Sequence, residues 1–143
     1  MDKEYSAYSL MLDRTSRRVK QYAQSKFKEL GFGVTVDQWV VMKQLYVKGN
    51  LSQTEIAELV FKDMPTLTRI IDLLCNKELA VRTPFENDRR KFSVSLTDKG
   101  HEKVKLMWEP VNEIRQKAWS GLSEEDFDKF QFILNKIYDN LQY

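Results

Sequence analysis

The stretch "SQTEIAELVFKDMPTLTRIIDLL", residues 52–74, holds two short amphipathic segments separated by a break. Ser52 and Glu55 form a capping box that predicts the start of the first helix, because the two side chains can satisfy each other's free backbone N–H groups. The run "FKDM" interrupts the apolar spacing, and Pro65 fits the first turn of a second helix, with Asp63 as its N-cap. Two short helices joined in this way indicate a helix-turn-helix.

The second helix, residues 65–78, has two distinct faces. At about 100° per residue, its core side is predicted to consist of Leu67, Ile70, Ile71 and Leu74. The opposite side carries Pro65, Thr66, Arg69, Asp72, Leu73 and Asn76, with Thr68 on the flank. Such a face suits a helix in a major groove, where arginine pairs with guanine and threonine contacts a thymine methyl group or a phosphate. The alternative is an ordinary solvated helix face.

Two strands are predicted directly after this helix. The segment "AVRTPF" is short, and Pro84 restricts it to an edge or an end. The segment "KFSVSLT" alternates strictly, with Phe92, Val94 and Leu96 on one face. Glu86-Asn87-Asp88 between the strands has the composition of a turn. A hairpin after a helix-turn-helix gives the winged variant of the motif.

The tip of this hairpin, residues 85–91, is unusually rich in charge. Asp88 and Arg90 project to the same side of an extended segment, so the carboxylate can hold the guanidinium in a fixed direction. An arginine aimed in this way can enter a narrow minor groove, while Arg89 and Lys91 contact phosphates. The alternative is a solvated turn whose charges keep the hairpin edge from aggregating.

The rest of the chain is predicted to be helical. One helix covers residues 5 to about 30, and Thr35 with Gln38 forms a capping box at the start of the next. In the last third, Pro110 should kink or interrupt a helix, and Ser123 caps the final one. The apolar stripes of these helices exceed what a winged core of about 70 residues can cover, so we expect a homodimer. The alternative is a monomer in which the helices cover one another.

Composition and charge favour a nucleic-acid partner over several other classes. The 143 residues suit one domain or one protomer, and residues 62–105 hold 10 Lys and Arg against 7 Asp and Glu. No apolar run approaches the ~18 residues of a membrane span, and no secretory signal is visible. The single Cys75 excludes an intrachain disulfide and a cysteine-cluster zinc site. We expect a cytoplasmic protein.

The segment "DMPTLTRIIDLL", followed within about twenty residues by "ENDRRKFSVSLTDKG", closely resembles the MarR family of bacterial and archaeal transcription regulators. The matching motifs are Pro-Thr-hydrophobic-Thr-Arg at 65–69, Asp-x-Arg at 88–90 and Leu-Thr-x-x-Gly at 96–100. The order of elements matches over nearly the whole chain. One departure is Glu78, which replaces the glycine usual after the reading helix. A non-glycine residue in a left-handed cap costs roughly 1 kcal/mol, so we expect this helix end to be shaped differently.

The resemblance implies a mainly α fold with a small β-hairpin wing. The helical dimerisation region is expected at 1–34 and 98–143 and the winged helix-turn-helix at 35–97. The implied function is a dimeric repressor that binds double-stranded DNA at an inverted repeat and is relieved by a small aromatic or phenolic effector. Reading helices would lie in major grooves and wings in minor grooves. The expected DNA-contacting residues are Lys62, Pro65, Thr66, Thr68, Arg69, Asn76, Arg89, Arg90 and Lys91, with Asp88 orienting the wing.

Other functions remain as alternatives. A small-molecule sensor or carrier with weak or lost DNA binding would use a cleft lined by Trp39, Met42, Tyr46 and Trp108, although such aromatics usually pack in a core. An enzyme is not expected, because the single His101 has no nucleophile or metal ligand placed beside it. No cofactor or metal is expected. Cys75 maps to the edge of the core side of its helix, which favours a buried thiol over a redox sensor.

Overall fold

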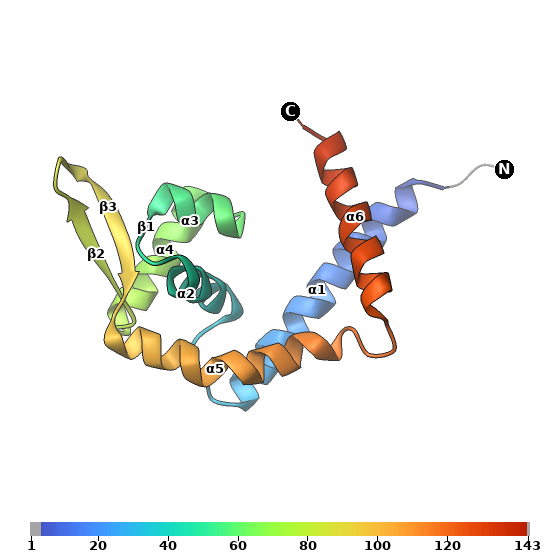
Figure 1. The fold of residues 1–143 in the computed structure, drawn as a ribbon, viewed down its shortest axis with the longest axis horizontal. Helices are drawn as coiled ribbons and strands as arrows, with labels where there is room; N and C mark the ends of the chain where they lie inside the picture. Colours follow the sequence, from blue (N-terminus) through green and yellow to red (C-terminus); the bar gives the residue numbers. More distant parts are fainter. Residues whose placement is uncertain (1–3, 143) are drawn as a thin grey trace.

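The computed structural model describes residues 4–142, apart from the side chain of Arg89. Its elements are α1 (Ser6–Glu29), α2 (Val36–Lys48), β1 (Leu51–Ser52), α3 (Gln53–Val60), α4 (Met64–Asn76), β2 (Ala80–Phe85), β3 (Asp88–Leu96), α5 (Asp98–Lys117) and α6 (Glu124–Asn140). Helices α2, α3 and α4 gather with the sheet into one lobe, from which α5 leads to α1 and α6 (Figure 1). The predicted winged helix-turn-helix is confirmed.

Local capping explains where the described helices other than α1 begin, because α1 has no side-chain cap. The capping boxes predicted at Thr35 and Ser52 are both present, and Ser123 forms the third with Asp126. Asp63 caps α4 by accepting the backbone N–H of Thr66 at 2.8 Å. This hydrogen bond stabilises the charged carboxylate and lowers the pKa of Asp63 below its usual value.

The sheet has three strands, one more than the sequence predicted. The two-residue strand β1 pairs antiparallel with β3, placing Leu51 opposite Val94, and the strand order is β1-β3-β2. Since β1 is too short to show alternation, no sequence pattern could reveal it. The strand also ties the start of α3 to the wing.

The wing turn is tighter than predicted. The turn contains Glu86 and Asn87 only, and Asp88 already belongs to β3. Phe85 pairs with Asp88 whereas Pro84 pairs with Phe92, so the register skips residues 89–91. Arg90 and Lys91 therefore lie in an irregular part of the strand, beside the break in its register.

The core is one continuous cluster around α4. It includes the predicted inward residues of α4 together with side chains from the second half of α1, α2, α3, β3 and α5. Leu67, Ile71 and Leu74 are fully buried. Helix α5 continues through Pro110 without the predicted interruption. Met107 and Val111, on either side of Pro110, are buried in the same cluster.

Two helices of the lobe end in left-handed residues that are not glycine. Phe61 follows α3 with φ 56°, and Glu78 follows α4 with φ 60°. The expectation that Glu78 would alter the helix end is wrong, because Glu78 adopts the left-handed conformation itself. The Leu79 N–H donates to the Leu74 carbonyl at 2.9 Å, as in a Schellman ending. Thr97 stabilises the turn by donating its hydroxyl to the Glu78 carbonyl at 2.7 Å.

Helix α5 begins directly against this turn. Thr97 is its N-cap and accepts the Gly100 N–H at 3.0 Å. A Cβ at Gly100 would lie 2.1 Å from the Leu79 carbonyl oxygen. The Leu-Thr-x-x-Gly motif thus allows the first turn of α5 to pack closely against Leu79, just after the end of α4. Within residues 4–142, no helix combines the length and the apolar character that spanning a bilayer requires.

Candidate nucleic-acid interface

The outward face of α4 presents the residues that the sequence predicted. Pro65, Arg69 and Asn76 are exposed, and Thr66 and Thr68 are half-buried on the same helix. Asp63 caps the helix, and Met64 and Pro65 in its first turn are exposed. This face offers one guanidinium, two hydroxyls and one amide, all of which can pair with base edges or phosphates.

The wing tip holds its arginine differently from the prediction. The Asp88 carboxylate accepts the backbone N–H of Arg90 at 3.0 Å, whereas the guanidinium Nε lies 3.9 Å from the same oxygen. Asp88 therefore shapes the strand and hardly restrains the arginine, whose side chain is 96% exposed. Lys91 is also exposed. The side chain of Arg89 lies outside the described part of the structure.

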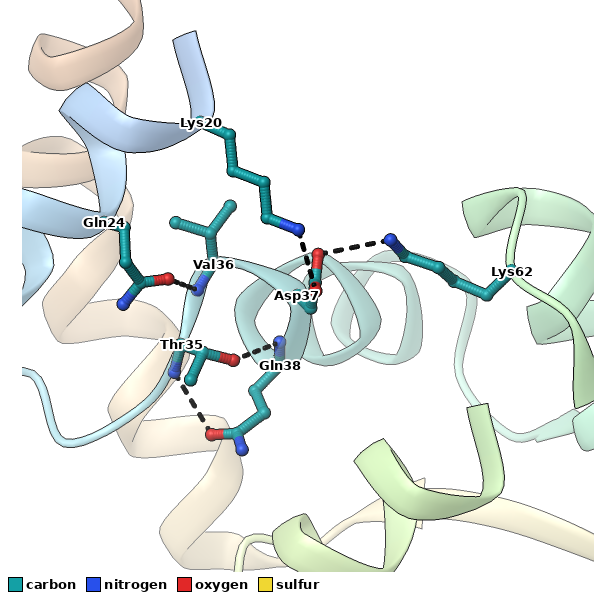
Figure 2. A network of polar contacts seen from close by, with 7 residues as sticks. All are labelled: Lys20, Gln24, Thr35, Val36, Asp37, Gln38 and Lys62. Carbon is teal, nitrogen blue, oxygen red and sulfur yellow. Dashed lines mark hydrogen bonds and ion pairs between the residues drawn. The ribbon is translucent and has the colours of Figure 1, made fainter. Parts of the chain in front are cut away.

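Lys62, predicted to contact the DNA backbone, takes part in a network of ion pairs. Its ammonium lies 3.4 Å from the Asp37 carboxylate, which also pairs with Lys20 at 3.0 Å (Figure 2). Burial alone would raise the pKa of Asp37, but the two ammonium groups outweigh it and the pKa lies below its usual value. The network joins α1, the start of α2 and the turn before α4. The ion pair with Asp37 therefore competes with any contact between Lys62 and a phosphate.

Polar contacts from the same region hold the α1–α2 junction. The Val36 N–H donates to Gln24 Oε1 at 3.1 Å, and the Thr35 N–H donates to Gln38 Oε1 at 3.1 Å (Figure 2). Lys77, at the end of α4, donates to that same Gln38 oxygen at 2.8 Å and to the Gly33 carbonyl at 2.8 Å. Burial, together with the charge of Lys103, lowers the pKa of Lys77. Sequence reasoning missed Lys77, because its partners lie 39 and 44 residues away.

Arg82 is a second residue that sequence reasoning missed. It lies on β2, and its guanidinium contacts three groups from α3 and α4. Nε donates to Gln53 Oε1 at 2.9 Å, Nη1 pairs with Asp72 Oδ1 at 2.7 Å, and Nη2 lies 3.4 Å from the Thr68 carbonyl oxygen. No local pattern marks such a residue, since an arginine on an edge strand is usually solvated. The guanidinium fixes α4 relative to the wing.

The residues predicted to line a ligand cleft form a packed aromatic cluster. Trp39 and Met42 are 2% and 0% exposed, and Trp39 meets Trp108 edge-on at a centroid distance of 6.4 Å. Tyr46 and Trp108 are half-buried, with ring centroids 5.8 Å apart. The Lys43 ammonium lies 5.1 Å from the centroid of Trp108. Of the four residues predicted to line the cleft, Tyr46 and Trp108 therefore present surface that a small molecule could contact, whereas Trp39 and Met42 do not.

The residues weighed for chemistry were His101 and Cys75. Within the described residues, no group of three or more His, Cys, Asp or Glu side chains could hold a metal ion. The ring of His101 lies 5.7 Å from that of Tyr46. Burial raises the pKa of the Cys75 thiol, which disfavours the reactive thiolate.

Helices α1 and α6 share an apolar groove that residues 4–142 leave open. None of the described residues of α6 is buried. The groove has a volume of about 480 Å³, and its lining comes from Tyr8, Met11, Leu12, Thr15, Ser16, Val19, Phe130, Ile133, Leu134 and Ile137. Trp119 anchors the start of α6 by edge contacts with Phe127 and Phe130. Exposed apolar surface of this extent is typical of an interface.

Comparison with known proteins places this geometry in context. The model of the MarR family matches residues 34–92, which run from the start of α2 into β3. The uncharacterized HTH-type transcriptional regulator YkoM of Bacillus subtilis is 29% identical over 124 residues, which are 86% of this chain and 79% of YkoM. The fold is similar to that of S. aureus MepR in a complex with DNA, with a TM-score of 0.84, 28% identity and coverage of 94% and 98% of the two chains. It is also similar to BpsR of Bordetella bronchiseptica, whose DNA binding is regulated by 6-hydroxynicotinic acid, with a TM-score of 0.83, 25% identity and coverage of 92% of each chain.

Proposed function

The chain belongs to the MarR family, and from this premise we propose that it is a dimeric regulator that binds an inverted-repeat operator in double-stranded DNA. The observation that carries the proposal is the shared surface of α4 and the wing. Arg69 on the helix and Arg90 on the wing are both exposed on the same lobe. Helix α4 would read a major groove while Arg90 enters the neighbouring minor groove.

The dimer would form through residues 1–34 and 98–143, with the winged domain at 35–97 between them. The groove between α1 and α6 supports this assignment, because a second copy of the chain would cover its apolar lining. A two-fold axis would set two α4 helices about one helical turn of DNA apart, roughly 34 Å. The bound site would then be an inverted repeat.

Contacts with DNA divide into base readout and backbone positioning. Arg69, Thr66, Thr68 and Asn76 would contact base edges or adjacent phosphates, with Pro65 packing at the groove edge. Lys91 and Arg89 would meet phosphates beside the minor groove, and Lys62 would do so after release from Asp37. Each lysine that neutralises a phosphate strengthens binding, and it also makes the affinity fall more steeply as the salt concentration rises.

Regulation by a small aromatic or phenolic effector is the remaining part of the proposal. The half-buried rings of Tyr46 and Trp108, with the Lys43 ammonium over the latter, offer both a stacking surface and a cation for an acidic ligand. An effector that favours a dimer with the wrong helix spacing would release DNA through a coupling of about 1–3 kcal/mol. The protein would then act as a repressor relieved by its ligand.

Loss of the wing arginine tests the DNA-binding part. In a gel-shift titration at fixed salt, Arg90→Ala should weaken operator binding by about 1–3 kcal/mol. Lys129→Ala is a matched control, since it removes an exposed cation from α6, away from the lobe. The operator itself would come from selection of bound fragments from a random DNA pool. Equal affinities for Arg90→Ala and the parent protein would remove the wing from the mechanism.

A further inference from the structure

The half-buried guanidinium of Arg82 determines how a neighbouring amide is turned. Its side chain is 24% exposed, and Nε donates to Gln53 Oε1 at 2.9 Å. A guanidinium has donors only, so the amide of Gln53 must present its oxygen to it. The ion pair between Arg82 and Asp72, at 2.7 Å, keeps the guanidinium in place. Arg82 thus fixes the orientation of the Gln53 side chain.

The other end of the same amide faces a residue of the reading helix. With its oxygen turned to Arg82, Gln53 directs its NH₂ group to the hydroxyl oxygen of Thr68 at 3.5 Å. The Nη2 atom of Arg82 lies 3.4 Å from the carbonyl oxygen of Thr68, so the hydroxyl and the carbonyl of this residue are both contacted. The contacts link β2, the first residue of α3 and the middle of α4.

This arrangement gives the Thr68 hydroxyl a defined polarity. Threonine in a helix often donates to the carbonyl four residues earlier, but the hydrogen bond described for this hydroxyl is one that it accepts. A hydroxyl has a single proton. That proton remains available for an acceptor outside the protein, on the face of α4 that also carries Arg69.

We propose that Arg82 and Gln53 are positioning residues that make Thr68 a hydrogen-bond donor toward DNA, so that α4 selects an acceptor edge at the base it faces. We call the contacts from Arg82 through Gln53 to Thr68 the relay. The inference rests on the proposed function and adds a rule of base preference to it. The acceptors in the major groove are N7 and O6 of guanine, N7 of adenine and O4 of thymine, whereas N4 of cytosine and N6 of adenine are donors.

A single isosteric change reverses this polarity. The carboxylate of Gln53→Glu would still bind Arg82, but it can only accept hydrogen bonds. The hydroxyl of Thr68 would then donate to residue 53 and offer its lone pairs to the DNA. The preferred base at the contacted position should shift from an acceptor to a donor. One net hydrogen bond corresponds to a change in relative preference on the order of fivefold.

The measurement is a selection of bound fragments from a duplex pool with randomised half-sites. It uses the whole chain and compares the base frequencies of the parent protein and each variant, position by position. Thr54→Glu controls for charge, because it adds the same negative charge one residue along the chain at an exposed position. Thr68→Val controls for the hydroxyl: in this background, Gln53→Glu should leave the base preference unchanged. Thermal unfolding of each variant confirms that it is folded.

The outcomes separate this inference from the proposed function. A switch at one symmetric pair of positions with Gln53→Glu, and only a uniform loss of affinity with Thr54→Glu, would support the relay. If the parent protein enriches a sequence and Gln53→Glu enriches the same one with unaltered base frequencies, the relay is wrong and the proposed function stands. If the parent protein enriches no sequence, the proposed function fails and the relay fails with it.

Discussion

Substitution of Gly100 by alanine should destabilise the protein far more than its helical position suggests. The added Cβ would lie 2.1 Å from the Leu79 carbonyl oxygen and 3.1 Å from Leu96 Cδ2. Since real Cβ atoms approach no closer than 3.0 Å, the first turn of α5 must move by about 1 Å. The carbonyl belongs to backbone held by the left-handed Glu78, so it cannot yield without disturbing the end of α4.

The magnitude follows from the contacts that this movement disrupts. Overpacking of a filled site costs about 1–3 kcal/mol. The Thr97 N–H to the Leu79 carbonyl, 3.1 Å, and the Thr97 hydroxyl to the Glu78 carbonyl, 2.7 Å, would both lengthen, at about 1 kcal/mol each. Alanine in place of a helical glycine stabilises the folded state by about 1 kcal/mol. The expected net loss is therefore about 3 kcal/mol, a large share of the ~5–15 kcal/mol that stabilises a domain.

Equilibrium unfolding in urea measures this loss. The variants must be compared at one protein concentration, since the stability of the proposed dimer would depend on it. Gly31→Ala is the matched control: Gly31 has φ 67° with nothing within 4 Å of an added Cβ, so only the left-handed conformation is penalised, at about 1 kcal/mol. If Gly100→Ala costs no more than Gly31→Ala, the close contact between α5 and Leu79 does not constrain the fold.

Further predictions concern the ion-pair network, the groove and the thiol. Asp37→Asn should lower stability at neutral pH. Because the pKa of Asp37 in the folded protein lies below its ordinary value of 3.8, the contribution is complete above that value and is lost as the pH falls through the folded-state pKa. Urea unfolding at pH 7 and pH 3 checks this, and an equal deficit at both values would contradict it. Ile133→Glu places a charge in the α1–α6 groove and should give a monomer in sedimentation velocity; an unchanged mass would show that the groove is not the interface. Peroxide should leave DNA binding intact, since burial raises the pKa of Cys75; release of DNA that Cys75→Ser prevents would refute this.

The parts of the fold that the sequence predicted correctly depend on neighbours in the chain. The caps at Thr35, Ser52 and Asp63 are confirmed. They could be predicted because a cap joins residues only three positions apart. The inward face of α4 is confirmed for the same reason, since helical periodicity is a local property. The strand β1 was missed because pairing with Val94 defines it, and that partner lies far along the chain.

In the candidate site, too, the features set by neighbours in the chain were predicted and those set by distant residues were not. The exposed face of α4 and the exposed Arg90 are local consequences of periodicity and of a turn. The contacts of Arg82 with Gln53 and Thr68 span 29 and 14 residues, so they could not be derived before the fold was known. The sequence predicted that the Asp88 carboxylate would hold the guanidinium of Arg90, because the two residues lie two positions apart on one side of the strand. The carboxylate instead accepts the backbone N–H, which is closer to it than the end of a long side chain.

Three sets of contacts that the sequence did not reveal restrain α4. Arg82 holds the middle of α4 to the wing, and Lys77 holds its end to the α1–α2 loop. The ion pairs of Asp37 connect the turn before it to α1. Bending α4 would break several of these interactions at once, whereas a small rotation of the lobe relative to the first half of α1 and to α6 would preserve most of them. In the proposed dimer, a proposed effector would therefore act more easily on the spacing between the two lobes than on the shape of either one.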